Sequence, residues 1–380
     1  MKRVVLLLET SRAFGRQLIS GVVRYSRLHS PWLFYKEPID LKSSIPNLTS
    51  WKPDGIIMRD TLITKDLLKL KIPTIFALHG SEYPKNIPLI ITDSSSIAKM
   101  ASDHFIEKGF KNFAFCGYDG IEWSEQRKSY FNRFNHEAGF RTYNYISLKR
   151  FRQNEWEKEQ QHVCRWIKDL PKPIGIFACN DDRGLHILEV CKLMNLKVPE
   201  DVAVIGVDND LMVCEFGDPP LSSIALNTES AGFEAAKLLD TMMSSGNKMK
   251  SRKIIATSSH IVQRQSSDIL AVNDKEVAQA IQFIKDNAKN KILIKDLLRT
   301  NGIGRQALEK KFRTTIHRTI YNEIQQVRIE SISKLLIETD VPISQITSLF
   351  NFTDAEHISR FFKKEKGMSM REYRKLHKSR

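Results

Sequence analysis

No apolar run in this 380-residue sequence reaches the roughly 20 residues that a helix needs to cross a bilayer. The apolar stretch Val4–Leu8 is too short for a signal-peptide core, and no small-residue cleavage site follows it, so we interpret it as a buried strand. The five cysteines form no CxxC pair, and the ten histidines have no metal-ligand spacing. These absences argue against a membrane protein, a disulfide framework and a metal site. They favour a cytoplasmic protein with reduced thiols.

The motifs of several enzyme classes are also missing. The sequence contains no G-x-G-x-x-G, no G-x-x-x-x-G-K-[ST] and no G-x-S-x-G. We therefore expect no catalytic residues and no cofactor. An enzyme that acts on sugars or nucleotides and carries an appended helical domain stays open as an alternative. A transport-type solute receptor is a further alternative, which the lack of a signal peptide and the basic C-terminal part disfavour.

Positive charge is abundant and unevenly distributed. The whole chain has a formal net charge of +15. Residues 274–380 hold 22 Lys and Arg against 13 Asp and Glu, a net charge of +9, while the other 273 residues carry +6. A basic density of this kind favours binding to nucleic acid, where Lys and Arg neutralise phosphates. A basic surface that is merely solvated is the alternative.

A short helical pattern occurs twice in the basic segment. The first copy is Ile294-x-x-Leu297, Gly302-Ile303 and Leu308-x-x-x-Phe312, and the second is Ile343-x-x-Ile346, Asn351-Phe352 and Ile358-x-x-x-Phe362. Each copy predicts a helix, a tight turn and a second helix. Gly302 and Asn351 tolerate the left-handed backbone of such a turn, and Thr353 with Glu356 predicts a capping box at the last such helix. Two tandem helix-turn-helix units indicate DNA binding.

The rest of the chain, residues 1–264, alternates strand-like and helix-like segments. Apolar runs such as Val202–Val207 lie between amphipathic segments such as Arg183–Met194 and Ser230–Met243. This order predicts an α/β domain of parallel sheets covered by helices on both faces, and its length favours two similar lobes. We expect this domain over 1–264, a linker over 265–274 and an all-α domain over 275–380. In the all-α domain a long helix near 320–338 should connect the two helix-turn-helix units.

Polar side chains follow four of the predicted strands. They are Asp60, Asp93, Asn180 with Asp181, and Asp208 with Asn209. Because the carboxyl ends of parallel strands open onto the ligand crevice, these side chains should converge there. Their oxygens accept hydrogen bonds from hydroxyl groups, and Arg16 and Arg127 can donate them, a combination that suits a sugar. The alternative at each single position is that Asp or Asn caps the following helix.

The C-terminal segment resembles the DNA-binding domain of the arabinose-operon regulator (AraC) family over about residues 275–377. The resemblance is carried by the segments 294–298, 308–313, 337–343, 361–369 and 372–374, which read IKDLL, LEKKFR, IETDVPI, FFKKEKGMS and EYR. Four positions depart from the family pattern. Gly304 replaces the usual Ser cap, Asn351 the usual turn Gly, and His317 and Ile320 a usual Gly and Pro.

The N-terminal part resembles the periplasmic-binding-protein-like domain of the lactose-repressor family. The residues that carry the resemblance are Cys179-Asn180-Asp181, the run VIGVDN at 204–209 and the run PPLSSI at 219–224. Such a domain ahead of an AraC-type domain resembles the xylose-operon regulators. The pattern Ala13-Phe14-x-Arg16-Gln17 with Gly21-Val22-x-x-Tyr25 matches that subgroup.

The resemblance implies a transcription regulator of sugar catabolism genes, expected to be an activator, that works as a homodimer. Repression stays open as the alternative, because it depends on where the operator lies relative to the promoter. The effector, D-xylose, would close the cleft between two lobes, and the partners of the regulator would be double-stranded promoter DNA and RNA polymerase. Arabinose, another monosaccharide or an oligosaccharide fragment stays open as the effector. The residues expected to bind the sugar are Arg16, Asp60, Asp93, Trp123, Arg127, Asn180, Asp208 and Asn209. Ordinary helix packing is the alternative for Trp123, and a surface position on a helix is the alternative for Arg127.

A recognition helix exposes polar side chains opposite its packed face. The residues then expected at base edges are Arg305, Gln306, Glu309 and Lys310 in the first unit and Ala355, Glu356, His357 and Arg360 in the second. For Glu356 the capping box is the competing role. Arg313, Lys363 and Lys364 are expected to contact phosphates, which sets the register on DNA without reading its sequence.

Overall fold

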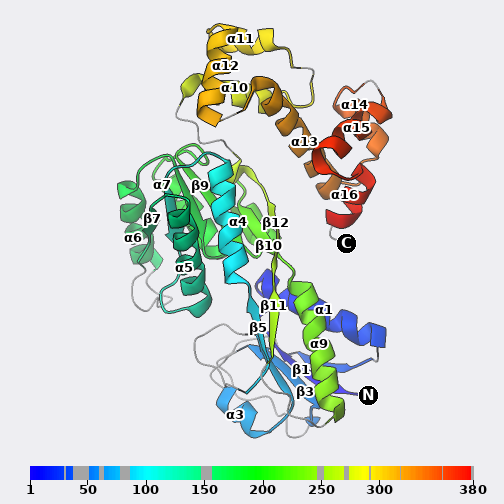
Figure 1. Ribbon diagram of the computed structural model, residues 1–380. Coiled ribbons are helices and arrows are strands. Elements are labelled where there is room, and N and C mark those ends of the chain that lie inside the picture. The colour runs from blue at the N-terminus through cyan, green and yellow to red at the C-terminus, as the bar shows by residue number, and fades with distance from the viewer. Residues whose placement is uncertain are drawn as a thin grey trace. The chain divides into compact units, whose positions relative to one another are not determined.

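The computed structural model divides into two compact units, Met1–Ile269 and Leu270–Arg380 (Figure 1). It describes residues 1–29, 31–36, 51–59, 64–77, 86–146, 156–245, 252–268, 274–290, 292–316, 318–352 and 354–377. Within these ranges no helix has the length and apolar character that crossing a membrane requires.

The first lobe of the N-terminal unit is built on a six-stranded parallel sheet in the order β11-β5-β4-β3-β1-β2. Its strands are β1 (Arg3–Leu7), β2 (Leu33–Lys36), β3 (Gly55–Arg59), β4 (Thr74–Ala77), β5 (Leu89–Thr92) and β11 (Lys253–Ala256). The central strands are apolar throughout because both faces are covered. Val4 and Leu6 belong to the core under α1 (Ala13–His29) and α9 (Thr228–Ser245), whereas Val5 and Leu7 pack with Leu67 of α3 (Thr64–Lys69).

The second lobe repeats this plan in the order β12-β10-β9-β8-β6-β7, with β10 and β12 antiparallel and the other neighbours parallel. Its strands are β6 (Phe113–Cys116), β7 (Thr142–Asn144), β8 (Ile174–Ala178), β9 (Val202–Val207), β10 (Ser222–Leu226) and β12 (Ser258–Val262). Its helices are α4 (Ser94–Glu107), α5 (Glu122–Glu137), α6 (Trp156–Asp169), α7 (Asp181–Leu193) and α8 (Leu211–Phe216). The matching strand order of the two sheets confirms the two similar lobes that the sequence predicts.

The segment expected as a linker, 265–274, begins with a packed turn. Residues Gln265–Ser267 form a short 3-10 helix, and Ser266 and Ser267 are fully buried. Ser266 Oγ donates a hydrogen bond to the carbonyl of Val204 in β9 at 2.7 Å. The start of this segment is therefore part of the second lobe.

The chain passes between the lobes at three described places that hydrogen-bond to one another. β5 continues into α4 at Asp93, β10 into α9 at Asn227, and β11 into β12 at Thr257. The backbone N–H of Asp93 donates to Ala256 O at 3.1 Å, and that of Asn227 donates to Thr257 O at 2.9 Å. Adjoining crossings of this kind are typical of a hinge, by which two lobes close around a ligand in other proteins.

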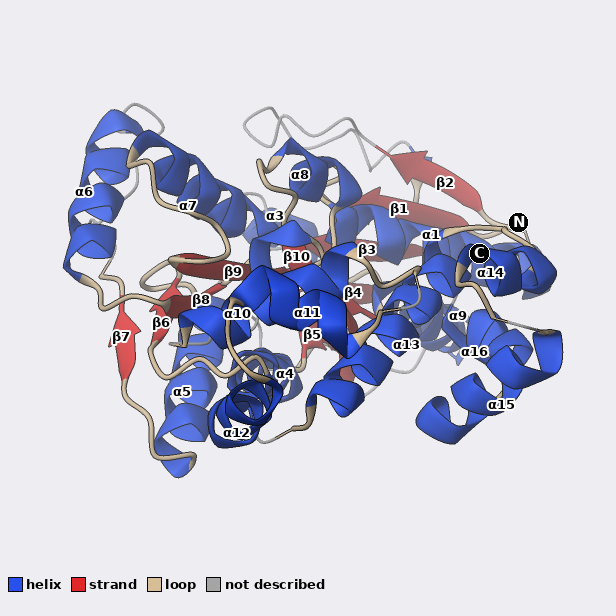
Figure 2. Cartoon of the chain, turned by 90° about the horizontal axis from the view of Figure 1, so that it is seen from above, coloured by secondary structure: helices blue, strands red, loops and turns tan. Residues whose placement is uncertain are grey.

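In the C-terminal unit the described elements are all helices (Figure 2). They are α10 (Lys275–Asp286), α11 (Ile294–Asn301), α12 (Arg305–Ile316), α13 (Ile320–Glu338), α14 (Ile343–Leu349), α15 (Ala355–Lys366) and α16 (Met370–His377). One core packs Leu308 and Phe312 of α12 against the first half of α13, and another packs Ile358 and Phe362 of α15 against its second half. α13 thus connects the two helix-turn-helix units, as predicted.

The turns of the two units have the predicted backbone. Gly302 and Asn351 both have positive φ, 66° and 52°. The predicted capping box of Thr353 and Glu356 is wrong. Asp354 is the residue that caps α15, because its carboxylate accepts a hydrogen bond from the His357 N–H at 2.6 Å. Thr353 lies outside the described residues.

Candidate functional site

Arg127 lies where the two lobes meet, and its side chain is only 2% exposed. From α5 its Nη1 donates to the carbonyl of Cys179, which follows β8, and its Nη2 donates to Thr92 Oγ1 of β5 at 3.3 Å. It therefore joins strand ends from both lobes and is not a surface helix residue. Its Nε is buried and has no acceptor among the described residues. A hydrogen-bond donor thus remains at this position.

The aromatic ring of Trp123 lies beside Arg127. The Cζ atom of Arg127 is 4.9 Å from the centre of the Trp123 ring, so the guanidinium covers one face of the indole. Tyr118 approaches the same ring edge-on, with the ring centres 6.3 Å apart. Trp123 is half-buried in this arrangement. Its packing on Arg127 fits the alternative of ordinary helix packing, and stacking of Trp123 on a sugar stays a prediction.

Asp208 lies at the carboxyl end of β9 with an uncommon backbone conformation. Its φ is 101°, a region that few residues other than glycine adopt. Burial raises the pKa of Asp208 to about 6, although the charge of Arg127 acts to lower it. Burial also lowers the pKa of Arg127, against the effect of the Asp208 charge. At pH 7 Asp208 offers a carboxylate acceptor at the end of β9, and Arg127 offers a guanidinium donor that contacts the ends of β5 and β8.

Arg16, on α1 of the first lobe, bonds to the second lobe. Its Nη2 donates to Asp210 Oδ1 at 2.8 Å, and the backbone N–H of Ala13 donates to Asp210 Oδ2 at 2.7 Å. The Asp210 carboxylate, which is 2% exposed, thereby satisfies a free N–H at the N-terminus of α1. Arg12 adds an ion pair with Asp182 of α7 at 2.6 Å. These four residues hold the lobes together.

Sequence reasoning missed Arg12, Asp182 and Asp210. The two aspartates stand within two residues of Asn180 and Asp208 in the same strand-end runs, and this was the signal available for them. Asp181 has a supporting role, because its buried carboxylate accepts from the Asp210 N–H at 2.7 Å. Burial and the nearby Asp208 charge raise the pKa of Asp181 well above its usual range.

Three other predicted ligand residues make hydrogen bonds within the second lobe. Asp93 caps α4 by accepting from the Ser96 N–H at 3.0 Å, and Asn180 caps α7 by accepting from the Arg183 N–H at 3.0 Å. The Oδ1 atom of Asn209 accepts from Arg264 Nη2 at 2.9 Å. Asp93 and Asn180 thus make the hydrogen bonds of the capping alternative, and their binding of a sugar stays a prediction. Asp60 lies outside the described residues.

A pair of substitutions at Asn180 separates its capping role from sugar binding. Asn180→Ala removes the cap of α7 and should cost about 1 kcal/mol of folding free energy. Asn180→Ser keeps a capping oxygen but lacks the amide, and it should leave both the stability and the sugar affinity close to wild type. Chemical denaturation and calorimetric titration measure the two quantities. A stable Ser variant with a large loss of sugar affinity would show that the Asn180 amide binds the sugar.

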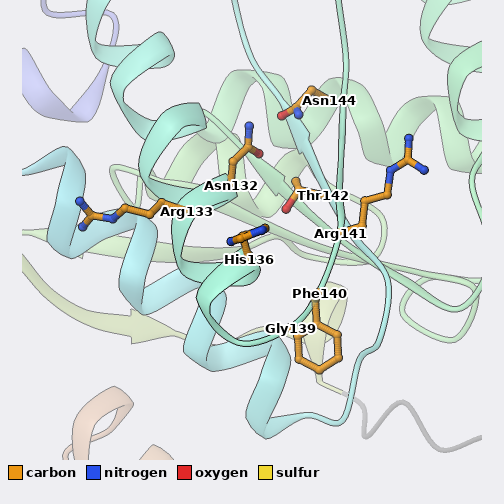
Figure 3. A pocket seen from close by; sticks show the side chains of 8 residues that line it. All are labelled: Asn132, Arg133, His136, Gly139, Phe140, Arg141, Thr142 and Asn144. Carbon is orange, nitrogen blue, oxygen red and sulfur yellow. The ribbon is translucent and has the colours of Figure 1, made fainter.

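A hollow of about 670 Å³ lies at the opposite, edge-strand side of the second lobe and not at these strand ends (Figure 3). It is lined by Asn132, Arg133, His136, Gly139, Phe140, Arg141, Thr142 and Asn144. The side chains of Arg133 and Arg141 extend in opposite directions, so they do not converge on a common ligand (Figure 3). We therefore place the candidate ligand site at Arg127 and Asp208.

The second candidate site is the outer surface of α12 and α15. Leu308, Phe312, Ile358 and Phe362 are fully buried, as predicted. The predicted DNA-contact residues that are exposed are Arg305, Gln306, Lys310 and Arg313 of α12 and Ala355, Glu356, His357, Arg360, Lys363 and Lys364 of α15. Glu309 differs from expectation because it is half-buried, with a buried Oε2 that has no partner among the described residues.

The two recognition helices are held by polar contacts as well as by their cores. Lys311 bonds to Asp274 and Glu276 at the start of α10, at 2.7 and 3.0 Å, and so fixes α12. Glu356 and Arg360 form an ion pair at 3.6 Å on the surface of α15. This pair is highly exposed and contributes little to stability, so both side chains can turn to another partner.

A two-lobed α/β unit joined to tandem helix-turn-helix units defines a ligand-responsive transcription regulator. Residues 102–267 match a periplasmic binding protein-like domain, and residues 297–376 match a helix-turn-helix domain. The chain is 30% identical to the xylose operon regulatory protein of Escherichia coli K12, over 98% of this chain and 96% of that protein. For the protein of that name from Haemophilus influenzae the identity is 30%, over 98% of each chain.

A solved structure of a xylose-binding transcription activator, xylR, covers 99% of this chain and 98% of its own, with 29% identity and a TM-score of 0.66. The chain belongs to the family of xylose operon regulatory proteins. The comparisons confirm the predicted fold class and the transcription regulator. They do not support the alternatives of an enzyme or a solute receptor, because these relatives are regulators.

Proposed function

We propose that this regulator binds D-xylose between the lobes of its N-terminal unit and activates sugar catabolism genes in the cytoplasm. The observation that carries the ligand site is Arg127, a buried guanidinium that bonds strand ends of both lobes near the carboxylate of Asp208. The names of the relatives support xylose over arabinose or an oligosaccharide fragment, the alternatives that remain.

Sugar hydroxyl groups both donate and accept hydrogen bonds, so their site needs both kinds of partner. In this proposal the carboxylate of Asp208 accepts from one hydroxyl, and the buried Nε of Arg127 donates to another. Bonds of this kind, with one charged partner, are stronger than bonds between neutral groups. Because the two residues stand close to the lobe boundary, a sugar held by them favours the arrangement in which the lobes are together.

A calorimetric titration of the full-length protein with D-xylose, L-arabinose, D-glucose and xylobiose tests this assignment. We expect D-xylose to bind with the highest affinity, because the additional hydroxymethyl group of a hexose has to find space in the same site. Tighter binding of L-arabinose or xylobiose would select an alternative effector. Failure of all four sugars to bind would contradict the proposed site.

The bonds of Asp210 across the lobes lead to a separate prediction. They form only when the lobes are together, so they and the sugar should stabilise the same arrangement. Asp210→Asn removes the charge that Arg16 and the Ala13 N–H share, and we expect about a tenfold loss of D-xylose affinity. Asp240→Asn is the matched control, because Asp240 pairs with Lys2 inside the first lobe. Equal affinities for both variants and wild type would contradict the role of Asp210.

We further propose that α12 and α15 enter successive major grooves about 34 Å apart on one face of the operator. The exposed base-reading candidates are Arg305, Gln306, Lys310, Ala355, Glu356, His357 and Arg360, and the exposed phosphate candidates are Arg313, Lys363 and Lys364. The positive charge of this region supports the proposal, because basic side chains bind DNA with release of counterions. A homodimer would present two such units, and contact with RNA polymerase would complete activation.

A further inference from the structure

Arg328 stands at the boundary between the two cores of the C-terminal unit. Its neighbour Val327 belongs to the core of the first helix-turn-helix unit, and Ile329 belongs to the core of the second. Both cores contain residues of α13, so this helix connects the two helix-turn-helix units. The orientation of one recognition helix relative to the other therefore depends on what stiffens the middle of α13.

The guanidinium of Arg328 bonds to segments on both sides of the boundary between the two cores of the C-terminal unit. Its Nη1 donates to Asn290 O, after α10, at 2.8 Å, and its Nη2 donates to Phe350 O at 2.6 Å. Phe350 is the C-cap residue that follows α14, at a helix end where free carbonyls and the negative end of the helix dipole favour a cation. The Cζ atom also lies 4.9 Å from the centre of the Phe352 ring. One side chain thus joins the segment after α10 to the turn of the second unit.

Asn351 makes a second connection between the same two segments. Its Nδ2 donates to Lys289 O at 3.2 Å, while its backbone takes the left-handed turn conformation, with φ of 52°. A glycine at this position would allow the same turn but would have no side chain to donate. The asparagine therefore does two things, of which the sequence predicts only the turn.

We propose that Arg328 and Asn351 are positioning residues that fix the separation of α12 and α15, so that the protein reads two half-sites at one set spacing. The planar guanidinium holds two carbonyls from different units in one fork, a geometry that lysine cannot reproduce. With the fork removed, each unit keeps its own core, but α13 can bend or twist between them. The inference rests on the proposed function, in which both recognition helices contact DNA.

The experiment measures how operator affinity depends on half-site spacing. An operator is first selected from random-sequence DNA with the full-length wild-type protein. The half-sites here are the two groups of base pairs that α12 and α15 of one protomer contact. Insertions of 1, 2, 3 and 5 base pairs are made between these half-sites, and affinities are measured by fluorescence anisotropy. Three inserted base pairs rotate one half-site by about 100° around the DNA axis. We expect the wild type to lose at least tenfold in affinity for this insertion and Arg328→Met to lose less than threefold. Asn351→Gly and Arg328→Lys should lie between the two.

Arg371→Met is the matched control, because it makes the same chemical change at an exposed position of α16. It should change the affinity by one factor for every spacing, and thermal unfolding checks that each variant is folded. Folded variants at 328 and 351 that keep the full wild-type spacing penalty would overturn the positioning role. If Arg328→Met does not fold, Asn351→Gly and Arg328→Lys decide between the same two results. A wild type without any spacing preference would instead contradict the two-helix contact with DNA.

Discussion

Replacement of Asp208 by Asn is expected to lower the affinity for D-xylose by about 10- to 100-fold while the protein stays folded. The substitution keeps the size of the side chain, and Asn tolerates positive φ better than most residues, so the strand end should keep its conformation. What is lost is a charged acceptor, whose hydrogen bond is worth about 1.5–3 kcal/mol. Calorimetric titration with the sugar gives the loss directly, at about 1.4 kcal/mol per factor of ten.

The matched control for this substitution is Asp103→Asn, which removes an exposed carboxylate paired with Lys99 on α4. We expect its sugar affinity to equal that of the wild type. An Asp208→Asn variant that also binds D-xylose with wild-type affinity would remove Asp208 from the site. A variant that does not fold would be recognised by its lost thermal transition.

The raised pKa of Asp208 gives the same substitution a pH-dependent signature. The folded-state pKa of about 6 exceeds the usual 3.8, so the folded protein holds this proton more tightly than the unfolded chain. Its contribution to stability is therefore present below about pH 4 and is lost as the pH rises to about 6. Sugar binding that needs the carboxylate should conversely weaken as the pH falls through 6. Both dependences should be missing in Asp208→Asn.

The joint substitution Lys310→Ala with Arg360→Ala is expected to weaken specific operator binding by about 100- to 10,000-fold. A side chain that reads a base contributes roughly 1–3 kcal/mol, and the two positions lie on different recognition helices, so their effects should add. Both side chains are exposed, and their loss should not disturb the cores under α12 and α15. Each single variant should lose about 10- to 100-fold in a gel-shift assay on the selected operator.

Lys363→Ala provides the comparison for this pair. As a phosphate contact it should weaken specific and non-specific DNA alike and reduce the slope of log affinity against log salt by about 0.9. The base-reading variants should instead lose specific binding by a larger factor than non-specific binding. Equal operator affinity for the wild type, Lys310→Ala and Arg360→Ala across a salt series would contradict the recognition-helix assignment.

The buried elements could be predicted from the sequence because burial leaves a periodic apolar pattern. The predicted run Val202–Val207 is β9, and the connecting helix near 320–338 is α13. The short edge strand β7 is only half-buried, and its sequence has no such pattern. α5 packs partly through buried Ser124, Arg127 and Asn135 and lacks a continuous apolar stripe, so its bounds could not be predicted from periodicity.

The candidate site could be predicted only in outline. Strand-end reasoning pointed to Asp208, but it could not distinguish a ligand from a helix cap, which is the role that Asp93 and Asn180 have. Arg127 was named as a possible donor to a sugar, but its burial depends on the approach of β5 and β8, which are distant in sequence. The bonds of Arg12 and Arg16 across the lobes depend in the same way on tertiary contacts that no local pattern contains.

Sugar held between the lobes is expected to change the affinity of the protein for its operator. The most direct test of this expectation is the operator affinity of the full-length wild-type protein, measured with and without saturating D-xylose at one salt concentration. We predict a change of at least fivefold, the lower end of common coupling energies between two sites, and no change in Asp208→Asn at the same sugar concentration. Identical operator affinity with and without D-xylose in the wild type, although the sugar binds, would contradict the account.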